Sequence, residues 1–259
     1  MQLDRKALKA EAKDIVKNAR VSAYLFTLLF MVIVIALTAL DNLVGTDVQI
    51  DPEVQATMRQ YGFTLYTIPP LVKVAAPIAG FIGLFVSFMN VVLSAGYLLY
   101  HMGIREGKEM PYATLFDGFT FVGKIILLAI VTSIFVFLWT LLFIIPGIIA
   151  GYRYRVAMYN LCENPEIGVM DALRMSKAQT AGFKWQLFVL DLSFLGWGIL
   201  CGLTAGILSI WVTPWMQQTN VGYFLECKRI TGVGSFPRAP AAGRATAPSS
   251  PGKCEAPAA

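Results

Sequence analysis

One acidic residue lies inside an otherwise apolar stretch, and its type and position are those of a group that could do chemistry. Asp191 stands in the string FVLDLSF. An acid in hydrocarbon is costly, so it is expected to pair with a cation, to accept hydrogen bonds from hydroxyls, or to serve as a proton or cation site. Arg153 and Arg155 lie at a comparable depth in the preceding apolar run, and Ser193 and Asn90 complete the candidate intramembrane polar site.

Two interpretations of Asp191 remain open at this point. In the first, the carboxylate pairs with Arg153 or Arg155, or accepts from hydroxyls such as Ser193, and fixes the register of two helices. In the second, Asp191 binds a transported proton or cation. The first is favoured, because a transport site usually contains more than one buried acid.

The sequence contains no motif of a known catalytic or metal centre. It has no HExxH, GxSxG, Walker loop, GxGxxG or CxxC string, its four cysteines are far apart, and its single histidine, His101, ends an apolar run. We therefore predict no enzymatic activity, no metal and no cofactor. The strings GFIG at Gly80 and GWGILCG at Gly196 are read as places where helices approach closely.

The composition is that of a membrane protein. Hydrophobic residues make up 56% of the 259 residues, charged residues only 14%, and the mean hydropathy is +0.62. A soluble domain usually carries about 25% charged residues. The net charge of +5 is assigned to cytoplasmic loops and not to nucleic-acid binding.

Four apolar runs are long enough to cross a bilayer, but a four-span topology conflicts with the charges. With the N-terminus inside, it would place residues 153–184, which carry five Lys and Arg, outside the cell. A weak internal repeat predicts three helical hairpins instead, with tight turns near Trp139 and near Cys201–Thr204. The six spans would then lie near 21–40, 74–100, 118–137, 140–161, 184–200 and 204–227.

The six-span arrangement puts both termini and every basic cluster in the cytoplasm. Residues 1–20 form a basic amphipathic segment, read either as a helix on the anionic inner leaflet or as a plain charge cluster. Residues 21–230 form the transmembrane domain with an external loop at 41–72, and the Gly/Pro/Ala-rich tail 231–259 is expected to be disordered. Anionic lipids of the inner leaflet are the expected partners, and self-association is left open.

Each predicted hairpin also contains a proline in its second helix, at Pro77, Pro146 and Pro214. A proline inside a helix removes one hydrogen bond and bends the axis, which neighbouring helices can compensate. Three kinked helices are therefore expected.

Several strings together carry a family resemblance. They include Ile145-Pro146-Gly147, Tyr152-Arg153-Tyr154, Glu163-Asn164-Pro165, Ser176, Lys184, Phe188, Asp191-Leu192-Ser193-Phe194, Gly196-Trp197 and Pro214. Over roughly residues 1–230 the chain resembles the bacterial family called domain of unknown function 975, whose members are multi-pass membrane proteins. The resemblance implies a location and an architecture, and it implies no reaction.

The sequence thus predicts an all-α, polytopic transmembrane helical bundle of the bacterial cell membrane. Its favoured function is that of a non-enzymatic scaffold or accessory protein. The alternative is a small transporter or permease that uses a buried Asp191 site. A polar cavity that reaches Asp191 would favour transport, and a tightly packed interior would favour the scaffold.

Overall fold

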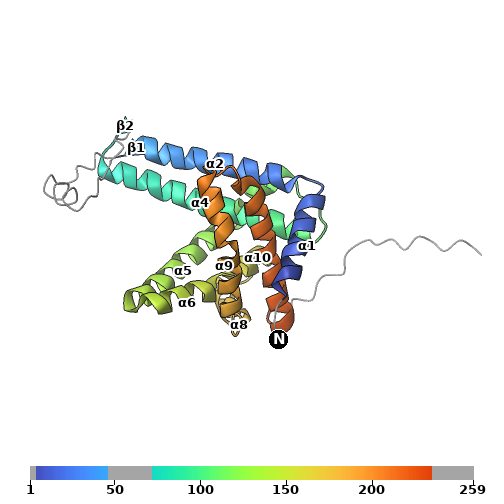
Figure 1. Ribbon diagram of the computed structural model, residues 1–259. Helices are drawn as coiled ribbons and strands as arrows, with labels where there is room; N and C mark the ends of the chain where they lie inside the picture. Colours follow the sequence, from blue (N-terminus) through green and yellow to red (C-terminus); the bar gives the residue numbers. More distant parts are fainter. Residues whose placement is uncertain (1–3, 46–71, 235–259) are drawn as a thin grey trace, which may run out of the picture.

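The computed structural model describes residues 4–45 and 72–234, which are mostly helical (Figure 1). In chain order the elements are α1 (Arg5–Asn18), α2 (Ala23–Leu43), β1 (Val44–Gly45), β2 (Val72–Lys73), α4 (Ala76–Arg105), the 3-10 helix η1 (Tyr112–Phe121), α5 (Val122–Leu142), α6 (Ile144–Tyr154), α7 (Ala157–Glu163), α8 (Val169–Gln179), α9 (Lys184–Leu203) and α10 (Ser209–Thr231). The all-α fold class is confirmed. Most of the loop 41–72 and of the tail 231–259 lies outside the described residues.

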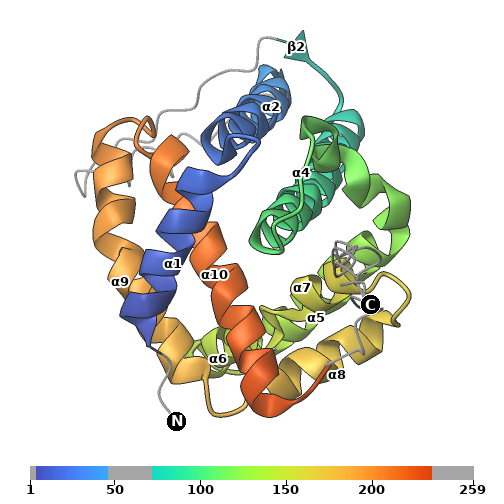
Figure 2. The ribbon, with the colours of Figure 1, turned by 90° about the vertical axis from the view of Figure 1, so that its right-hand side faces the viewer.

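Four helical segments in the described part are long and apolar enough to cross a membrane. They are Ala23–Leu43, Ala76–Arg105, Tyr112–Leu142 and Lys184–Leu203. Helical segments occupy all six predicted positions. The fourth is divided into α6 and α7, however, and the sixth, α10, is not apolar enough to count as a candidate span. The six-span count is therefore not confirmed. Figures 1 and 2 also show that α10 lies across the α2–α4 pair, with α1 alongside it.

Two of the three prolines lie in the first turn of a helix, and one lies inside a helix. Pro77 lies in the first turn of α4 and Pro146 in the first turn of α6, and only Pro214 lies inside a helix, α10. The predicted kinks at Pro77 and Pro146 are therefore wrong. A proline in the first turn costs little, because the N–H groups of that turn have no partner within the helix.

The turn between α5 and α6 is tighter and later than predicted. It consists of Phe143 alone, whose extended backbone (φ −159°, ψ 145°) separates the two helices, and not of residues near Trp139. The two helices are in close contact next to this turn, because a Cβ added to Gly147 of α6 would lie 2.2 Å from Oγ1 of Thr140 in α5. The chain therefore reverses and α6 returns along α5. The last hairpin turns at 204–208, next to its predicted place.

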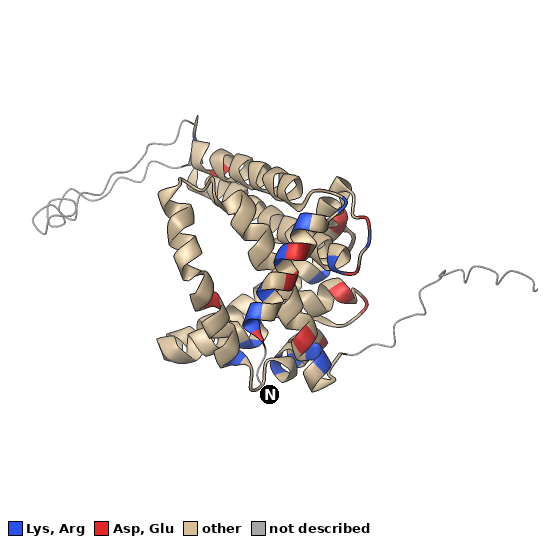
Figure 3. Cartoon of the chain, turned by 45° about the vertical axis from the view of Figure 1, so that its right-hand side comes forward, with Lys and Arg blue, Asp and Glu red and all other residues tan. Residues whose placement is uncertain are grey.

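Most charged residues gather at one end of the molecule (Figure 3), with Asp41 and Lys73 as exceptions at the tip of the α2–α4 hairpin. Specific contacts join the helix ends there. Arg105 at the end of α4 pairs with Glu11 of α1 at 2.6 Å, and Lys228 near the end of α10 pairs with Glu163 at the end of α7. We call this the polar end. The apolar surface lies elsewhere, as at Phe81, Leu141 and Leu203, which are 73%, 74% and 79% exposed.

The tightest backbone contacts are made by glycines outside the two Gly-rich strings. Within those strings only Gly83 has a neighbour, Oδ1 of Asp41 at 3.4 Å from an added Cβ. A Cβ on Gly96 of α4 would lie 2.0 Å from the backbone oxygen of Leu115, and one on Gly118 would lie 2.5 Å from that of Val92. The backbones of α4 and η1 thus touch at two places. Around Gly80 and Gly196 no such atom lies within 4 Å. The predicted packing role of those two glycines is therefore wrong.

Buried side chains form three apolar clusters between the helices. The largest joins α4, α5, α7, α8 and α10, the second joins α1, α2, α4 and η1, and the third lies between α9 and α10. In the second, the rings of Phe26 and Tyr100 stack at 3.7 Å between centroids. The amphipathic segment 1–20 contributes here, because Ala12 and Val16 of α1 are buried in the protein. The contact of α1 with anionic lipid stays a prediction.

Candidate intramembrane polar site

Asp191 lies two turns into α9 and contacts the end of α6. Its Oδ2 accepts a hydrogen bond of 2.9 Å from the Tyr152 hydroxyl and a second from Nη1 of Arg155. Nη2 of Arg155 donates to Oδ1 of Asn220 on α10 at 3.3 Å. The side chains of Arg155 and Asp191 are 28% and 32% exposed. The ion pair thus connects the end of α6 to α9, and the hydrogen bond to Asn220 adds α10. We call Tyr152, Arg155, Asp191 and Asn220 the Asp191 cluster.

Of the two arginines considered for this pair, Arg155 is the partner. The Arg153 side chain makes no ion pair with Asp191, and its Nε is buried with no hydrogen-bond acceptor among the described residues. The backbone oxygen of Arg153 accepts from the hydroxyls of Ser176 at 2.8 Å and Thr180 at 3.3 Å. Arg153 therefore anchors α8 to α6 through its main chain.

Ser193 and Asn90 do not join Asp191. The Ser193 hydroxyl donates to the backbone oxygen of Leu190, and it accepts a hydrogen bond of 2.7 Å from Nζ of Lys9. The Asn90 amide donates to the backbone oxygen of Val86 in its own helix at 3.0 Å. The five residues of the predicted site thus lie in four separate places, and only Asp191 and Arg155 come together.

Tyr152, Asn220 and Lys9 were not among the predicted site residues. Asn220 ends the string QQTN in α10, and this polar run within the last predicted span was a usable signal. Lys9 lies 3.9 Å above the ring of Phe194 and reaches Ser193, so α1 packs against α9. Burial, and then the neighbouring Arg5, lowers the pKa of Lys9.

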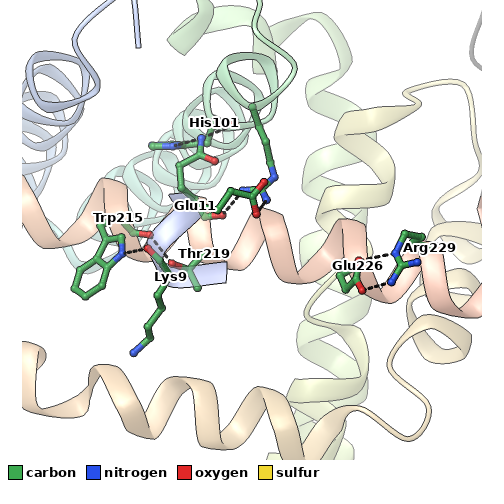
Figure 4. A network of polar contacts seen from close by, with 9 residues as sticks. Lys9, Glu11, His101, Trp215, Thr219, Glu226 and Arg229 are labelled. Carbon is green, nitrogen blue, oxygen red and sulfur yellow. Dashed lines mark hydrogen bonds and ion pairs between the residues drawn. The ribbon is translucent and has the colours of Figure 1, made fainter. Parts of the chain in front are cut away.

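A second polar network joins α1, α4 and α10 (Figure 4). The Trp215 indole donates to the backbone oxygen of Lys9 at 2.9 Å. The amide nitrogen of Gln218 lies 2.6 Å from the backbone oxygen of His101 and 3.1 Å from its Nδ1. Arg105, which pairs with Glu11, also donates to the backbone oxygen of Gln218 at 3.4 Å. His101 therefore serves as a packed, hydrogen-bonded link between α4 and α10.

Metal-binding groups are not assembled in the part of the chain that the structure describes. There, no three His, Cys, Asp or Glu side chains lie close enough to hold an ion. Cys162, Cys201 and Cys227 are free thiols. Two cavities, of about 350 Å³ and 270 Å³, lie beside α1 and beside α5, and Asp191 is not in the wall of either.

The part of the chain that holds the Asp191 cluster matches a known family. Residues 140–231 match the family model described as protein of unknown function (DUF975). The resemblance read from the sequence is confirmed for this segment, and the match does not reach the residues before 140. No curated protein and no solved structure matches the chain.

The DUF975 segment runs from the last turn of α5 to the end of α10. All four residues of the Asp191 cluster lie within it, as do Arg153 and Ser193. Asn90 and Lys9 lie outside it, so α4 and α1, which carry them, contact the DUF975 segment but are not part of the family match. The family description gives no activity, and the function has to be argued from the site.

Proposed function

We propose that this chain is a multi-pass protein of the bacterial cell membrane that acts as a non-enzymatic scaffold or accessory protein. One observation carries the proposal. The only charged group inside the apolar part of α9, Asp191, is engaged by Arg155 and Tyr152 in a contact between helices. Removing one partner of such a pair leaves the other charge uncompensated, so the carboxylate is committed to a contact between helices and not to a substrate.

The alternative, transport through Asp191, would need a polar path to the carboxylate. The cavity beside α1 does not reach it. The cavity beside α5 has Arg155, the partner of Asp191, in a wall that is otherwise mainly apolar, and Asp191 itself does not line it. Beside the cluster, Leu190 and Tyr223 are completely buried, while Arg155 and Asp191 keep 28% and 32% of their side chains exposed. The engagement of Asp191 by Arg155 and Tyr152 is therefore the observation that favours the scaffold.

Proton flux distinguishes the two functions. In liposomes that contain the purified protein and a pH-sensitive dye, we expect an imposed pH gradient to decay as slowly as in protein-free liposomes. Asp191→Asn, which removes the charge but keeps the shape, should give the same trace. A fast decay that Asp191→Asn abolishes would establish transport and refute the scaffold.

The orientation is proposed from charges and contacts together. Lys124 at the start of α5 donates to the backbone oxygen of Pro165, just after α7, so the basic stretch 153–184 lies at the same end of the molecule as the start of α5. Arg105 and Lys228 lie at this polar end as well. Since Lys and Arg collect on the cytoplasmic side, we assign the polar end and both termini to the cytoplasm. Both ends of each helical hairpin then lie on the cytoplasmic side of the membrane.

Cysteine labelling tests this orientation. On a background without native cysteines, a single cysteine at Ala178 in α8 should not react with an impermeant maleimide in sealed cells, and it should react after the cells are opened. Arg59→Cys, in the loop expected outside, is the matched positive control. Labelling at position 178 from outside would reverse the proposed placement of α8.

A further inference from the structure

The cavity beside α5 lies where α6 gives way to α7. It has a volume of about 270 Å³ and is walled by α5 on one side and by residues 151–158 on the other. No atom outside the helix's own backbone lies within 4 Å of a Cβ added to Gly151, so the floor of this groove is empty at that glycine. The neighbouring residues of α5, Ile134 and Phe137, are 51% and 65% exposed. Because α5 belongs to a segment apolar enough to cross the membrane, the groove opens toward lipid.

The groove has a polar band that the protein leaves unused. Thr132 and Ser133 line it, and neither hydroxyl makes a hydrogen bond to a described residue. Thr140, on the same helix, donates instead to the backbone oxygen of Val136 at 2.8 Å. A hydroxyl in an apolar setting is costly without a partner, so the two free hydroxyls favour an occupant that carries oxygen atoms.

Arg155 lies in the wall of the groove, where it is already paired with Asp191, and a second positive charge, Lys124, lies below the groove on α5. Lys124, Leu128, Thr132 and Val136 are spaced by four residues, which places them in one stripe along the helix. Lys124 forms a hydrogen bond with the backbone oxygen of Pro165 and no ion pair with a described residue. Its charge is therefore available to an anion at the polar end. Two turns, about 11 Å, separate Lys124 from Thr132.

We propose that this groove binds one anionic phospholipid of the inner leaflet. The phosphate lies at Lys124, an ester oxygen accepts from Thr132 or Ser133, and one acyl chain fills the space between Val136 and Gly151. The order of charge, hydroxyls and apolar wall along the stripe is that of a phospholipid read from its headgroup to its tail. The site rests on the orientation proposed above, in which the start of α5 faces the cytoplasmic leaflet.

Native mass spectrometry of the full chain in mild detergent tests the site with phosphatidylglycerol and phosphatidylcholine as probes. We expect one phosphatidylglycerol to bind more tightly than phosphatidylcholine. Gly151→Phe should fill the groove and weaken binding about tenfold. Gly198→Phe is the matched control, because the surroundings of Gly198 on α9 are equally open, and it should bind as the unaltered protein does. Lys124→Gln should remove the preference for phosphatidylglycerol while keeping the acyl contact.

A photoactivatable phosphatidylglycerol provides a readout that needs no variant. With a diazirine in its acyl chain, it should label residues 128–136 and 151–158 of the unaltered protein. Equal binding by Gly151→Phe and Gly198→Phe, with labels elsewhere, would overturn the site. So would a dimer of the unaltered chain that Gly151→Phe dissociates, since a second copy would then occupy the groove, or tight binding of oleate alone. The maleimide experiment at position 178 reports separately on the orientation, so failure of the lipid site and failure of the topology give different results.

Discussion

Gly96→Ala is expected to be the most damaging single-methyl substitution among the glycines of α4. The new Cβ would lie 2.0 Å from the backbone oxygen of Leu115 and 2.6 Å from its carbonyl carbon. Neither atom can rotate away as a side chain would, so α4 and η1 must separate. Overpacking of this kind usually costs 1–3 kcal/mol, and an obstacle made of backbone puts the expected loss at about 3 kcal/mol. Thermal unfolding in mild detergent, followed by tryptophan fluorescence, measures it.

Gly80→Ala in the same helix is the control. No atom outside the helix's own backbone lies within 4 Å of its added Cβ, and Ala is the better helix former by roughly 1 kcal/mol. Its unfolding temperature should be unchanged or higher. Gly118→Ala, whose Cβ would meet the backbone oxygen of Val92 at 2.5 Å, should fall between the two. Equal stability of the Gly96 and Gly80 variants would mean that α4 and η1 are not in contact.

Asp191→Ala is expected to destabilise the protein by about 2 kcal/mol, between the values for exposed and for fully buried ion pairs, because this pair is only partly buried. The substitution leaves the Arg155 guanidinium, 28% exposed, without its carboxylate, and it removes the acceptor of the Tyr152 hydroxyl. Asp191→Asn should cost less, because the amide oxygen still accepts a hydrogen bond. Detergent-solubilised variants compared by unfolding temperature test the order. If the Asp191→Ala variant were as stable as the unaltered protein, the Asp191 cluster would not stabilise the fold.

The positions of the helices could be predicted from hydropathy, but their turns could not. The string WTLLFIIPG is apolar apart from Thr140, and nothing in its composition distinguishes a turn at Trp139 from one at Phe143. Pro146 was the usable signal. Read as the first turn of a helix and not as a kink, it places the start of α6 at Ile144. The same reading of Pro77 places the start of α4.

Side-chain partners were the least predictable part. Arg153 and Arg155 are two residues apart, so on a helix they point in nearly opposite directions and only one can face α9. The sequence does not indicate which. The close contact at Gly96 was equally hidden, because it depends on η1, a segment with no apolar period of its own. The Gly-rich strings suggested close packing, yet no atom lies near an added Cβ at Gly80 or Gly196. The isolated glycines Gly96 and Gly118 are the ones that lie against the backbone of a neighbouring element.

A double-mutant cycle between Asp191 and Arg155 tests most directly the claim that Asp191 holds helices together and does not carry a substrate. The cycle compares Asp191→Ala, Arg155→Leu and the double variant, with Arg153→Leu in place of Arg155→Leu as the matched control. We expect a coupling energy of about 2 kcal/mol for Asp191 with Arg155 and a value near zero with Arg153. Coupling near zero with Arg155 would contradict the account and would leave Asp191 free for transport.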